Sequence, residues 1–335
     1  MEQATLFQEM SLKPEPLREK NDVQYFHLAA KTILNSCNTC RMPNAVTLNP
    51  YRGCEFGCAY CYARYTHEFM ELPWGDFERR IFVKTAAPGI LLRTLDVEKL
   101  RGKHVAIGSA TDPYQPAESR FHLTRRLLEV FAQVRGLSIS LTTKSALVKR
   151  DIDLFLKIGE RNDFRVNVSL ISLNAALLRA LEPKSSTPEA RLGALKSITE
   201  AGVPAGVLLM PIIPALTDSE RTLESVIRAA AAHGAQYVHG RVLFLKDSAK
   251  RSFYEFLKRT TPHLHSRYSR IYGKRIYTSD EYQREILSKV KRLKEKYNLN
   301  QRDKEFEPYE VVDHTGNLFE NQCDRTRPTA AGEKM

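Results

Sequence analysis

The sequence is poor in cysteine and has no long apolar run, and each scarcity excludes a class of protein. Six cysteines in 335 residues are too few for a disulfide scaffold. No stretch approaches the roughly 18 apolar residues that a membrane-spanning helix needs. The first residues lack the basic and apolar regions of a secretory signal. We therefore expect a cytoplasmic protein without a membrane segment, and 42% hydrophobic residues suffice for one substantial core.

Three of the six cysteines stand close together, and their spacing is the strongest chemical signal in the chain. Cys54, Cys58 and Cys61 follow the pattern C-x3-C-x2-C within the stretch NPYRGCEFGCAYCYARYTHEF. Clustered thiolates suit a [4Fe–4S] cluster, which usually takes four cysteine ligands. Three ligands leave one iron open to a second ligand, and this indicates reaction chemistry rather than electron storage.

The cysteine pattern resembles that of the radical S-adenosylmethionine (SAM) superfamily, and the chain resembles in particular its spore photoproduct lyase-like branch. The resemblance extends from Asn49 to Phe244 through GSATDPYQPAES, LTTKSALVKRD, ALEPKSSTPEARL and AGVPAGVLLMPIIPAL. It implies that SAM binds the open iron and is cleaved reductively to a 5′-deoxyadenosyl radical, which removes hydrogen from a substrate. It also implies a reducing partner of the flavodoxin or ferredoxin type.

The resemblance further assigns residues to SAM by matching segments. Tyr60 corresponds to the aromatic residue whose backbone meets the adenine, and Lys144 to a lysine that contacts the SAM carboxylate. Ser109 and Ser169 correspond to strand-end contacts with the cofactor. The backbone of residues 207–211 matches the strand that cradles the adenine. Each strand-end residue has a simpler alternative, because such side chains are often only satisfied polar groups.

The segment TDPYQP supplies the candidate catalytic residues, Asp112 and Tyr114. It follows a strand end, on the face where barrel enzymes work, and so could line the substrate pocket together with Gln115. Alternatively, Asp112 only begins a turn before Pro113. Two further charged residues, Glu182 and Arg191, either pair with each other or touch SAM.

One departure from the lyase-like pattern narrows the chemistry. Spore photoproduct lyases need a cysteine on the strand after the cluster loop, to return a hydrogen atom to the substrate radical. Here Ser109 or Ala110 stands at that position, and no cysteine occurs between Cys61 and Cys323. Because an O–H bond is much stronger than an S–H bond, this argues against thymine-dimer repair by that route.

A zinc site is the alternative for the cysteines. Cys37-x2-Cys40 followed by Cys58-x2-Cys61 has the spacing of a zinc ribbon, which would make the chain a non-catalytic zinc-containing nucleic-acid-binding protein. That alternative leaves Cys54 without a role. Cys37, Cys40 and Cys323 otherwise serve a second metal site, supply hydrogen or are ordinary thiols, and His67 is a weaker zinc candidate.

The remaining pattern predicts an α/β fold. Apolar stretches alternate with helical patterns, which demands a parallel sheet with right-handed crossovers. The resemblance decides its form, a partial (β/α)6 TIM-type barrel with the cluster in the loop after the first strand. The expected strands are 45–48, 80–83, 104–109, 137–143, 164–169, 205–212 and 237–245, and the clearest helices are 124–134, 187–201, 218–232 and 280–297.

We divide the chain into four parts. Residues 1–44 form an irregular N-terminal extension, 45–245 the core barrel, 246–304 a basic, tyrosine-rich helical extension, and 305–335 a C-terminal tail. The helix at 280–297 carries an apolar stripe that docks on the barrel.

The charge is concentrated in the third part. Between Lys246 and Lys304 stand 17 Lys and Arg against 7 Asp and Glu, with six tyrosines among them. Such a segment can follow a phosphate backbone and stack on bases. The alternative is a solvated helix face whose tyrosines close the barrel end. The substrate is therefore open between a nucleic acid or nucleotide and a peptide or small metabolite. Nothing resembles a dimerisation motif, so we expect a monomer.

Overall fold

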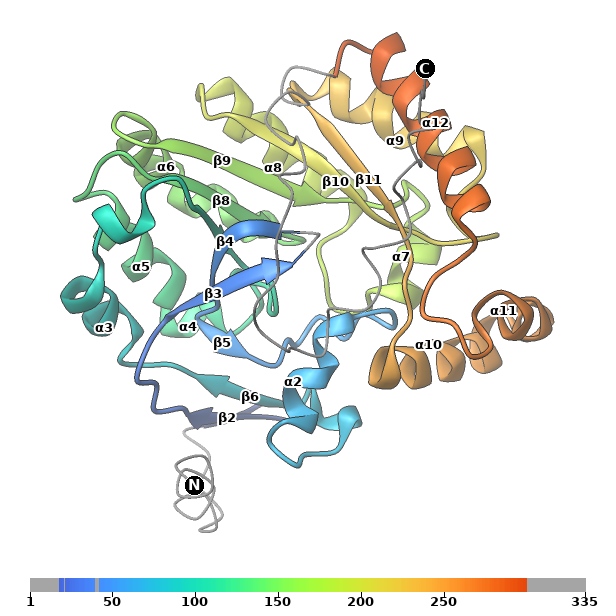
Figure 1. The fold of residues 1–335 in the computed structure, drawn as a ribbon, viewed down its shortest axis with the longest axis horizontal. Helices are drawn as coiled ribbons and strands as arrows, with labels where there is room; N and C mark the ends of the chain where they lie inside the picture. Colours follow the sequence, from blue (N-terminus) through green and yellow to red (C-terminus); the bar gives the residue numbers. More distant parts are fainter. Residues whose placement is uncertain (1–17, 21, 40–41, 300–335) are drawn as a thin grey trace, which may run out of the picture.

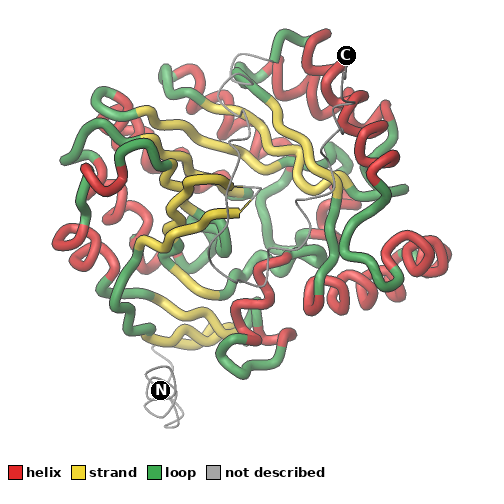
Figure 2. The backbone as a smooth tube through the Cα atoms, viewed as in Figure 1, coloured by secondary structure: helices red, strands yellow, loops and turns green. Residues whose placement is uncertain are grey.

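A computed structural model describes residues 18–20, 22–39 and 42–299 of the chain. The described strands form two sheets, a central one and a smaller one near the N-terminal end of the ribbon (Figures 1 and 2). The strand order is β11-β10-β9-β8-β7-β4-β3 in the seven-stranded sheet and β1-β2-β6-β5 in the four-stranded sheet. Their bounds are β1 Arg18–Lys20, β2 Val23–His27, β3 Leu34–Thr39, β4 Met42–Leu48, β5 Tyr51–Arg52, β6 Arg80–Val83, β7 His104–Ile107, β8 Ser138–Thr143, β9 Asp163–Ser169, β10 Ala205–Ile212 and β11 Val238–Val242.

The larger sheet is an open barrel wall. Among the described strands, β4 and β7 to β11 pair in parallel, and β3 joins the edge antiparallel to β4. The strand order ends at β11 on one side and β3 on the other, so the sheet does not close on itself. The predicted partial (β/α)6 barrel is confirmed, with six parallel strands in the described part of the chain.

The helices begin and end near the predicted positions. Thr187 caps α8, because its hydroxyl accepts a hydrogen bond from the Ala190 amide at 3.3 Å. Ser219 caps α9, one residue after the predicted start at 218, and Ser279 caps α12. The helical segments are η1 Tyr62–Arg64, α2 Tyr65–Glu68, η2 Trp74–Asp76, α3 Ala87–Thr94, η3 Glu98–Leu100, α4 Glu118–Phe121, α5 Leu123–Phe131, η4 Ala146–Asp151, α6 Ile152–Gly159, α7 Ala175–Leu181, α8 Pro188–Glu200, α9 Glu220–Ala232, α10 Asp247–Thr260, η5 Pro262–Leu264, α11 His265–Tyr272 and α12 Asp280–Lys296.

The two faces of the larger sheet differ in chemistry because side chains alternate along each strand. Val105 and Ile107 of β7 are buried in one continuous apolar core together with the inward residues of the helices. His104, at the start of the same strand, instead bonds Ser138 and Ser140 of β8 through its two ring nitrogens, at 2.9 and 2.7 Å. One face thus holds the helices in place, and the other presents polar groups.

Two predictions about the fold are wrong. Within the expected irregular extension, the described residues 18–20 and 22–39 contain β1, β2 and β3, because β2 pairs with β6 and β3 pairs with β4. The strand at 80–83 exists but belongs to the smaller sheet rather than to the barrel series. Short strands gain their stability from partners distant in sequence, which local patterns do not reveal.

The segment after β11 is helical, as predicted. Helix α12 packs on β11 and α9 through the buried side chains Ile286, Val290 and Leu293, so the docking of its apolar stripe is confirmed. Helix α10 packs on η1 and α2, which directly follow Cys61 (Figure 1). Among the described helices, none combines the length and apolar character needed to cross a membrane.

Candidate active site

The three clustered cysteines lie on the loop between β5 and η1, just beyond the carboxyl end of β4. The loop is fixed from outside by backbone hydrogen bonds: the Cys54 amide donates to the Phe77 carbonyl at 3.0 Å, and the Ala59 amide to the Leu181 carbonyl at 2.9 Å. Gly53 has a φ of +84°, and a Cβ there would lie 2.9 Å from the Phe77 carbonyl oxygen. A glycine is therefore required where the chain enters this loop.

The three thiols are close neighbours in a poorly solvated place. Cys54 and Cys58 are buried, Cys61 is partly exposed, and none forms a disulfide. Burial raises the pKa of Cys58 to about 12, although the Lys144 ammonium opposes the shift. Burial also raises the pKa of Cys54, to which Asp112 and the other two thiols add. These groups are neutral thiols at pH 7 on their own, and a bound cation is what would stabilise three thiolates here.

Arg64 braces the loop from within. Its side chain is 2% exposed and donates to the Cys58 carbonyl at 3.2 Å and to the Glu78 carboxylate at 2.7 Å. The guanidinium also lies over the rings of Trp74 and Phe77, at 6.0 and 5.5 Å. Arg64 lowers the pKa of Cys61, against the larger effect of burial. A buried cation with these partners fixes the cysteine loop and favours negative charge on it.

The TDPYQP segment holds the same loop from the other side. The Thr111 hydroxyl and the Gln115 amide donate to the Gly53 carbonyl at 2.7 and 3.2 Å. The Gln115 carboxamide oxygen accepts from the Glu55 amide at 2.9 Å. Gln115 is fully buried, so its bonds to the loop are shielded from water. The segment after β7 therefore positions the cysteines.

Asp112 joins the ends of two strands. Its carboxylate accepts from the Thr143 hydroxyl at 2.6 Å, the Lys144 amide at 2.7 Å and the Tyr114 amide at 2.9 Å. Burial raises its pKa, and these hydrogen bonds oppose the shift. Asp112 thus fixes the backbone that carries Lys144, which is a positioning role. Its predicted catalytic role stays a prediction.

Tyr114 faces a different set of partners. It is 1% exposed, and its hydroxyl donates to the Asp151 carboxylate at 2.8 Å. Arg150 pairs with Asp151 at 2.8 Å and with Glu118 at 2.7 Å, so Tyr114 belongs to a buried ionic network next to α4 and η4. Its hydroxyl therefore has a structural partner in this network. Its catalytic role also stays a prediction.

Lys144, Tyr60 and the Glu182–Arg191 pair form a compact group beside Cys58. The Tyr60 hydroxyl donates to Glu182, whose carboxylate pairs with the Arg191 guanidinium, and both members of the pair have fully buried side chains. The Lys144 ammonium lies over the Tyr60 ring at 5.9 Å. Although burial acts to lower it, the pKa of Lys144 is raised by Cys58, Glu182 and Asp112. The structure therefore selects the ion pair for Glu182 and Arg191.

The two serines assigned to SAM also lie at the carboxyl edge of the sheet, where the parallel strands end. The Ser169 carbonyl, at the end of β9, accepts from the Arg191 guanidinium at 2.9 Å. The Ser109 hydroxyl accepts from the Asn49 carboxamide at 3.1 Å, and the Tyr62 hydroxyl donates to the Ser109 carbonyl. The carboxyl edge thus gathers Tyr60, Ser109, Lys144 and Ser169 around the cysteine loop, while their contacts with SAM stay predictions.

His67 is explained by packing alone. It is fully buried, its Nε2 lies 2.9 Å from the Arg80 carbonyl oxygen, and its ring contacts Phe77 and Phe82. Burial lowers its pKa to about 4, so the ring is neutral at pH 7. It supports α2 against the smaller sheet.

The zinc alternative needs Cys37 and Cys40. Cys37 lies on β3 and is partly exposed, whereas Cys40 and Cys323 lie outside the described residues. Within the described ranges, no three His, Cys, Asp or Glu side chains form a site for a single metal ion. A cubane cluster differs in this respect, because each cysteine binds a different iron.

Four of the six tyrosines of the C-terminal extension serve packing. Tyr268 and Tyr272 are fully buried and donate to the carbonyls of Pro214 and Leu243, at 2.5 and 2.8 Å. Tyr282 donates to Asp218 at 2.6 Å, and Tyr297 to Glu224 at 2.8 Å. The alternative that tyrosines close the barrel end fits these contacts, and base stacking by these four does not.

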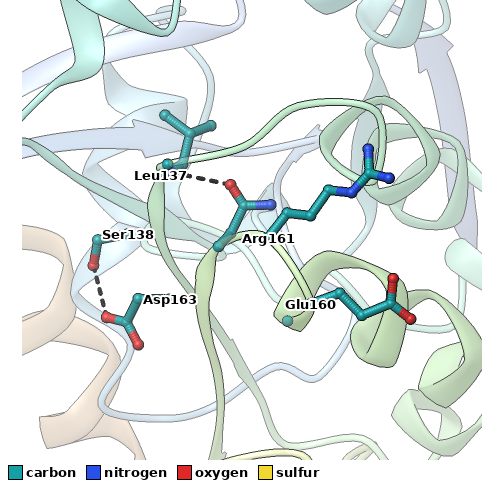
Figure 3. Close-up of a pocket in the computed structure, with 8 residues that line it drawn as sticks. Leu137, Ser138, Glu160, Arg161 and Asp163 are labelled. Atoms are coloured by element: carbon teal, nitrogen blue, oxygen red, sulfur yellow. Dashed lines mark hydrogen bonds between the residues drawn. The ribbon is translucent and has the colours of Figure 1, made fainter.

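A surface depression at the opposite, amino edge of the sheet is lined by Leu137, Ser138, Glu160, Arg161 and Asp163 (Figure 3). The Ser138 hydroxyl donates to Asp163 at 3.2 Å, and Arg161 and Glu160 are exposed. None of the candidate site residues lies there.

The sequence patterns did not indicate Arg64, Thr111 and Asn49. Each acts through backbone groups of the cysteine loop or of the β7 end, and such bonds depend on the folded arrangement. An arginine in the apolar turn CYARY, directly after the third cysteine, was the one available signal for Arg64.

Comparison with known proteins places this site in a family. The family model for the radical SAM superfamily matches residues 48–226. An uncharacterized protein of Mycobacterium tuberculosis is 34% identical over 279 residues, which are 83% of this chain and 82% of the relative. One of Methanocaldococcus jannaschii is 32% identical over 227 residues, 67% of this chain and 80% of that protein.

A solved structure shares the fold. A spore photoproduct lyase mutant with bound AdoMet and dinucleoside spore photoproduct superposes with a TM-score of 0.65 at 17% identity, over 88% of this chain and 91% of that one. At this identity the likeness concerns the fold.

Proposed function

The chain belongs to the radical SAM superfamily and is an enzyme, and we propose that it holds one [4Fe–4S] cluster on Cys54, Cys58 and Cys61. The observation that carries this proposal is the set of three neighbouring thiols on a loop fixed from both sides. Soft thiolates suit iron–sulfur clusters, and three of them leave one iron for a second ligand. The radical SAM chemistry of the family requires that open position.

When bound, the cluster and SAM supply reductive cleavage of the sulfonium and abstraction of hydrogen from the substrate. The residues of the chain itself bind and orient the cluster and SAM. Lys144 offers a cation beside Cys58 to neutralise the SAM carboxylate, with Tyr60, Ser109 and Ser169 as further SAM contacts. Asp112 holds the backbone of Lys144, and Arg64 stabilises negative charge on the loop.

Anaerobic reconstitution with iron and sulfide tests this proposal. We expect four irons and four sulfides per chain in the one-cluster protein, and 5′-deoxyadenosine on addition of SAM and dithionite. Zinc retained instead, with SAM left intact, would overturn it and favour the zinc-binding alternative. In the cell, the reductant is a flavodoxin- or ferredoxin-type protein. Thiolate-bound clusters suit a reducing compartment, so a cytoplasmic location is part of the proposal. A monomeric state is proposed as well.

For the substrate, we propose a nucleic acid or nucleotide over a peptide or small metabolite. From Asp247 to Arg275 the chain has eight Lys and Arg against two acids, and seven of the eight are exposed. Because α10 packs on η1 and α2, which follow Cys61, the charged segment begins beside the cysteine loop, and α11 extends it by packing on α10. Many cations and few acids in one exposed segment favour binding of a phosphate backbone. The exposed residues are Arg251, Lys258, Arg259, Arg267, Arg270, Lys274 and Arg275.

Salt-dependent binding of single-stranded DNA and RNA checks this assignment. Replacing Arg267, Arg270 and Lys274 by Glu should reduce the slope of log K against log[salt] by about one for each phosphate that is no longer neutralised. Arg284→Glu on α12 is the matched control, because it is also exposed. Binding without salt dependence, or an equal effect in the control, would favour the peptide or metabolite. Thymine-dimer repair is not part of the proposal, because Ser109 or Ala110 stands where that route needs a thiol.

A further inference from the structure

Two cations lie together at the entrance to the cysteine loop and have no role in the site described so far. Arg52 ends β5 and Lys84 follows β6. Arg52 pairs with Phe82 in the antiparallel register of β5 and β6. The Lys84 amide donates to the Pro50 carbonyl at 3.2 Å, and this bond extends the same register beyond the two strands. Positions 82 and 84 share a face, so Arg52 and Lys84 lie on the same face of the smaller sheet.

The other face of β5 is electrically balanced. The Tyr51 hydroxyl donates to Glu118 at 2.5 Å, and Glu118 pairs with Arg150 at 2.7 Å. The carboxylate that is bonded to this strand therefore lies on the opposite face from Arg52 and already has a cation.

The face of Arg52 and Lys84 has no such balance. Within the described ranges, neither cation forms an ion pair with a carboxylate. Lys84 donates to the Asn49 carbonyl at 2.9 Å, and burial together with the Arg52 charge lowers its pKa to about 8. Both side chains are partly exposed, so a solute can reach them. Two like charges held together in a poorly solvated place are unfavourable without an anion.

Asn49 connects this pair to the proposed SAM site. Its carbonyl accepts from Lys84, its carboxamide oxygen accepts from the Ala110 amide at 2.8 Å, and its amide group donates to the Ser109 hydroxyl at 3.1 Å. An anion on the cation pair would thus lie beside the carboxyl edge of the barrel. Tyr65 of α2 lies near the Arg52 guanidinium, which acts to lower the pKa of the Tyr65 phenol.

We propose that Arg52 and Lys84 form an anion subsite that holds a phosphate group of the substrate next to the proposed SAM site. Arg can bind an oxyanion with two parallel N–H donors, and Lys adds a compact point charge, a combination that suits phosphate. The inference rests on the proposed function, because it assigns the subsite to the substrate of that reaction. It assigns recognition of a substrate phosphate to these two residues.

Acylation of lysines measures occupancy of this subsite directly. The reconstituted protein is treated briefly with an N-hydroxysuccinimide ester of acetate, and modification of each lysine is read by mass spectrometry. The probes are inorganic phosphate, thymidine monophosphate, succinate and SAM. We expect thymidine monophosphate to lower modification of Lys84 by about tenfold at ten times its dissociation constant, and Lys103, exposed at the amino edge, to stay unchanged.

Variants of Arg52 separate the subsite from general effects. Arg52→Gln should abolish protection of Lys84, while Arg52→Lys should retain part of it, which shows that loss in the first variant is not a folding defect. Absence of protection in the unmodified chain, or equal protection in Arg52→Gln, would overturn the subsite. Succinate protecting as well as phosphate would overturn the phosphate assignment, and SAM protecting alone would overturn the assignment to substrate.

Formation of 5′-deoxyadenosine in the same samples distinguishes the two proposals. Protection of Lys84 without cleavage of SAM would contradict the proposed function and leave the anion subsite intact. Cleavage of SAM without protection by any phosphate probe would contradict only the subsite.

Discussion

The two edges of the seven-stranded sheet carry charged side chains in opposite circumstances. At the carboxyl edge, Glu182, Arg191 and Arg64 are buried and joined across long stretches of sequence, as in the bond from Tyr60 to Glu182. At the amino edge, Glu160 and Arg161 are exposed around a surface depression (Figure 3). Buried charge is retained only where paired or hydrogen-bonded. The difference indicates that the functional site lies at the carboxyl edge and that the depression is ordinary surface.

The largest effect should come from the cysteine loop itself. Cys58→Ala removes one of only three protein ligands, so we expect it to abolish both the iron content and the formation of 5′-deoxyadenosine. Cys37→Ala, on β3 outside the loop, is the control and should keep both. Iron, sulfide and nucleoside product are measured in both variants. Equal loss in the two variants would contradict the assignment of the cluster to the cysteine loop.

The next effect concerns the buried ion pair. Glu182→Gln leaves the Arg191 guanidinium buried without its counter-charge, and we expect the free energy of unfolding to fall by about 3–5 kcal/mol. Glu160→Gln at the amino edge should change it by less than about 0.5 kcal/mol. Urea denaturation measures both. A similar small change in both variants would show that the carboxyl edge is no more strongly built than its opposite.

The pH dependence of stability tests the packing of His67. Its pKa is about 4 in the folded protein against 6.5 as the ordinary value, so the unfolded chain binds the proton more readily. The contribution of His67 to the free energy of unfolding is full above about pH 6.5. It falls by about 3 kcal/mol as the pH decreases to about 4. His67→Gln should remove that part of the loss, measured by urea denaturation at several pH values. His104, whose pKa is also about 4, should keep its own share in the variant.

A smaller effect is expected for the cation beside Cys58. Lys144→Met should raise the KM for SAM by about 10- to 100-fold, as loss of a charged hydrogen bond of about 1.5–3 kcal/mol implies. The matched control is Lys157→Met on α6, which is exposed and should leave KM unchanged. Steady-state formation of 5′-deoxyadenosine gives both values. An unchanged KM in Lys144→Met would remove this lysine from the proposed SAM site.

The smallest effect should come from the depression. Arg161→Ala removes an exposed guanidinium, so unfolding free energy and SAM cleavage should both stay within about 0.5 kcal/mol of the unsubstituted protein. Calorimetric melting and the nucleoside assay check this. A marked loss of SAM cleavage would reverse the comparison between the two edges.

Much of the barrel could be predicted from the sequence because its strands are short, apolar and separated by well-capped helices. The predicted helix at 187–201 agrees with α8 within one residue at each end, because Thr187 caps it and Pro188 suits its first turn. By contrast, β3 contains the polar stretch Asn35–Ser36–Cys37, and only its register against β4 makes it a strand. The strand at 80–83 was predictable as an element but not in its sheet, since pairing with β2 and β5 is a long-range choice.

The site divides in the same way. The cysteine triplet is local in sequence and could be found directly. The bond of Arg64 to the Cys58 carbonyl and those of Thr111 and Gln115 to Gly53 depend on the folded backbone. Asp112 was predicted as a candidate for chemistry, and the structure gives it three backbone and hydroxyl donors that tie two strand ends together. Roles that consist of holding backbone groups leave almost no signature in residue type or spacing.

The most direct test of the central claim is electron paramagnetic resonance of the dithionite-reduced, reconstituted protein with and without SAM. A cluster with three cysteine ligands has one iron that SAM can bind, so we predict a [4Fe–4S] signal whose g-values shift on addition of SAM. The Cys58→Ala variant should lack the signal. A signal that SAM leaves unchanged would mean that no iron is open to it, and would contradict the account.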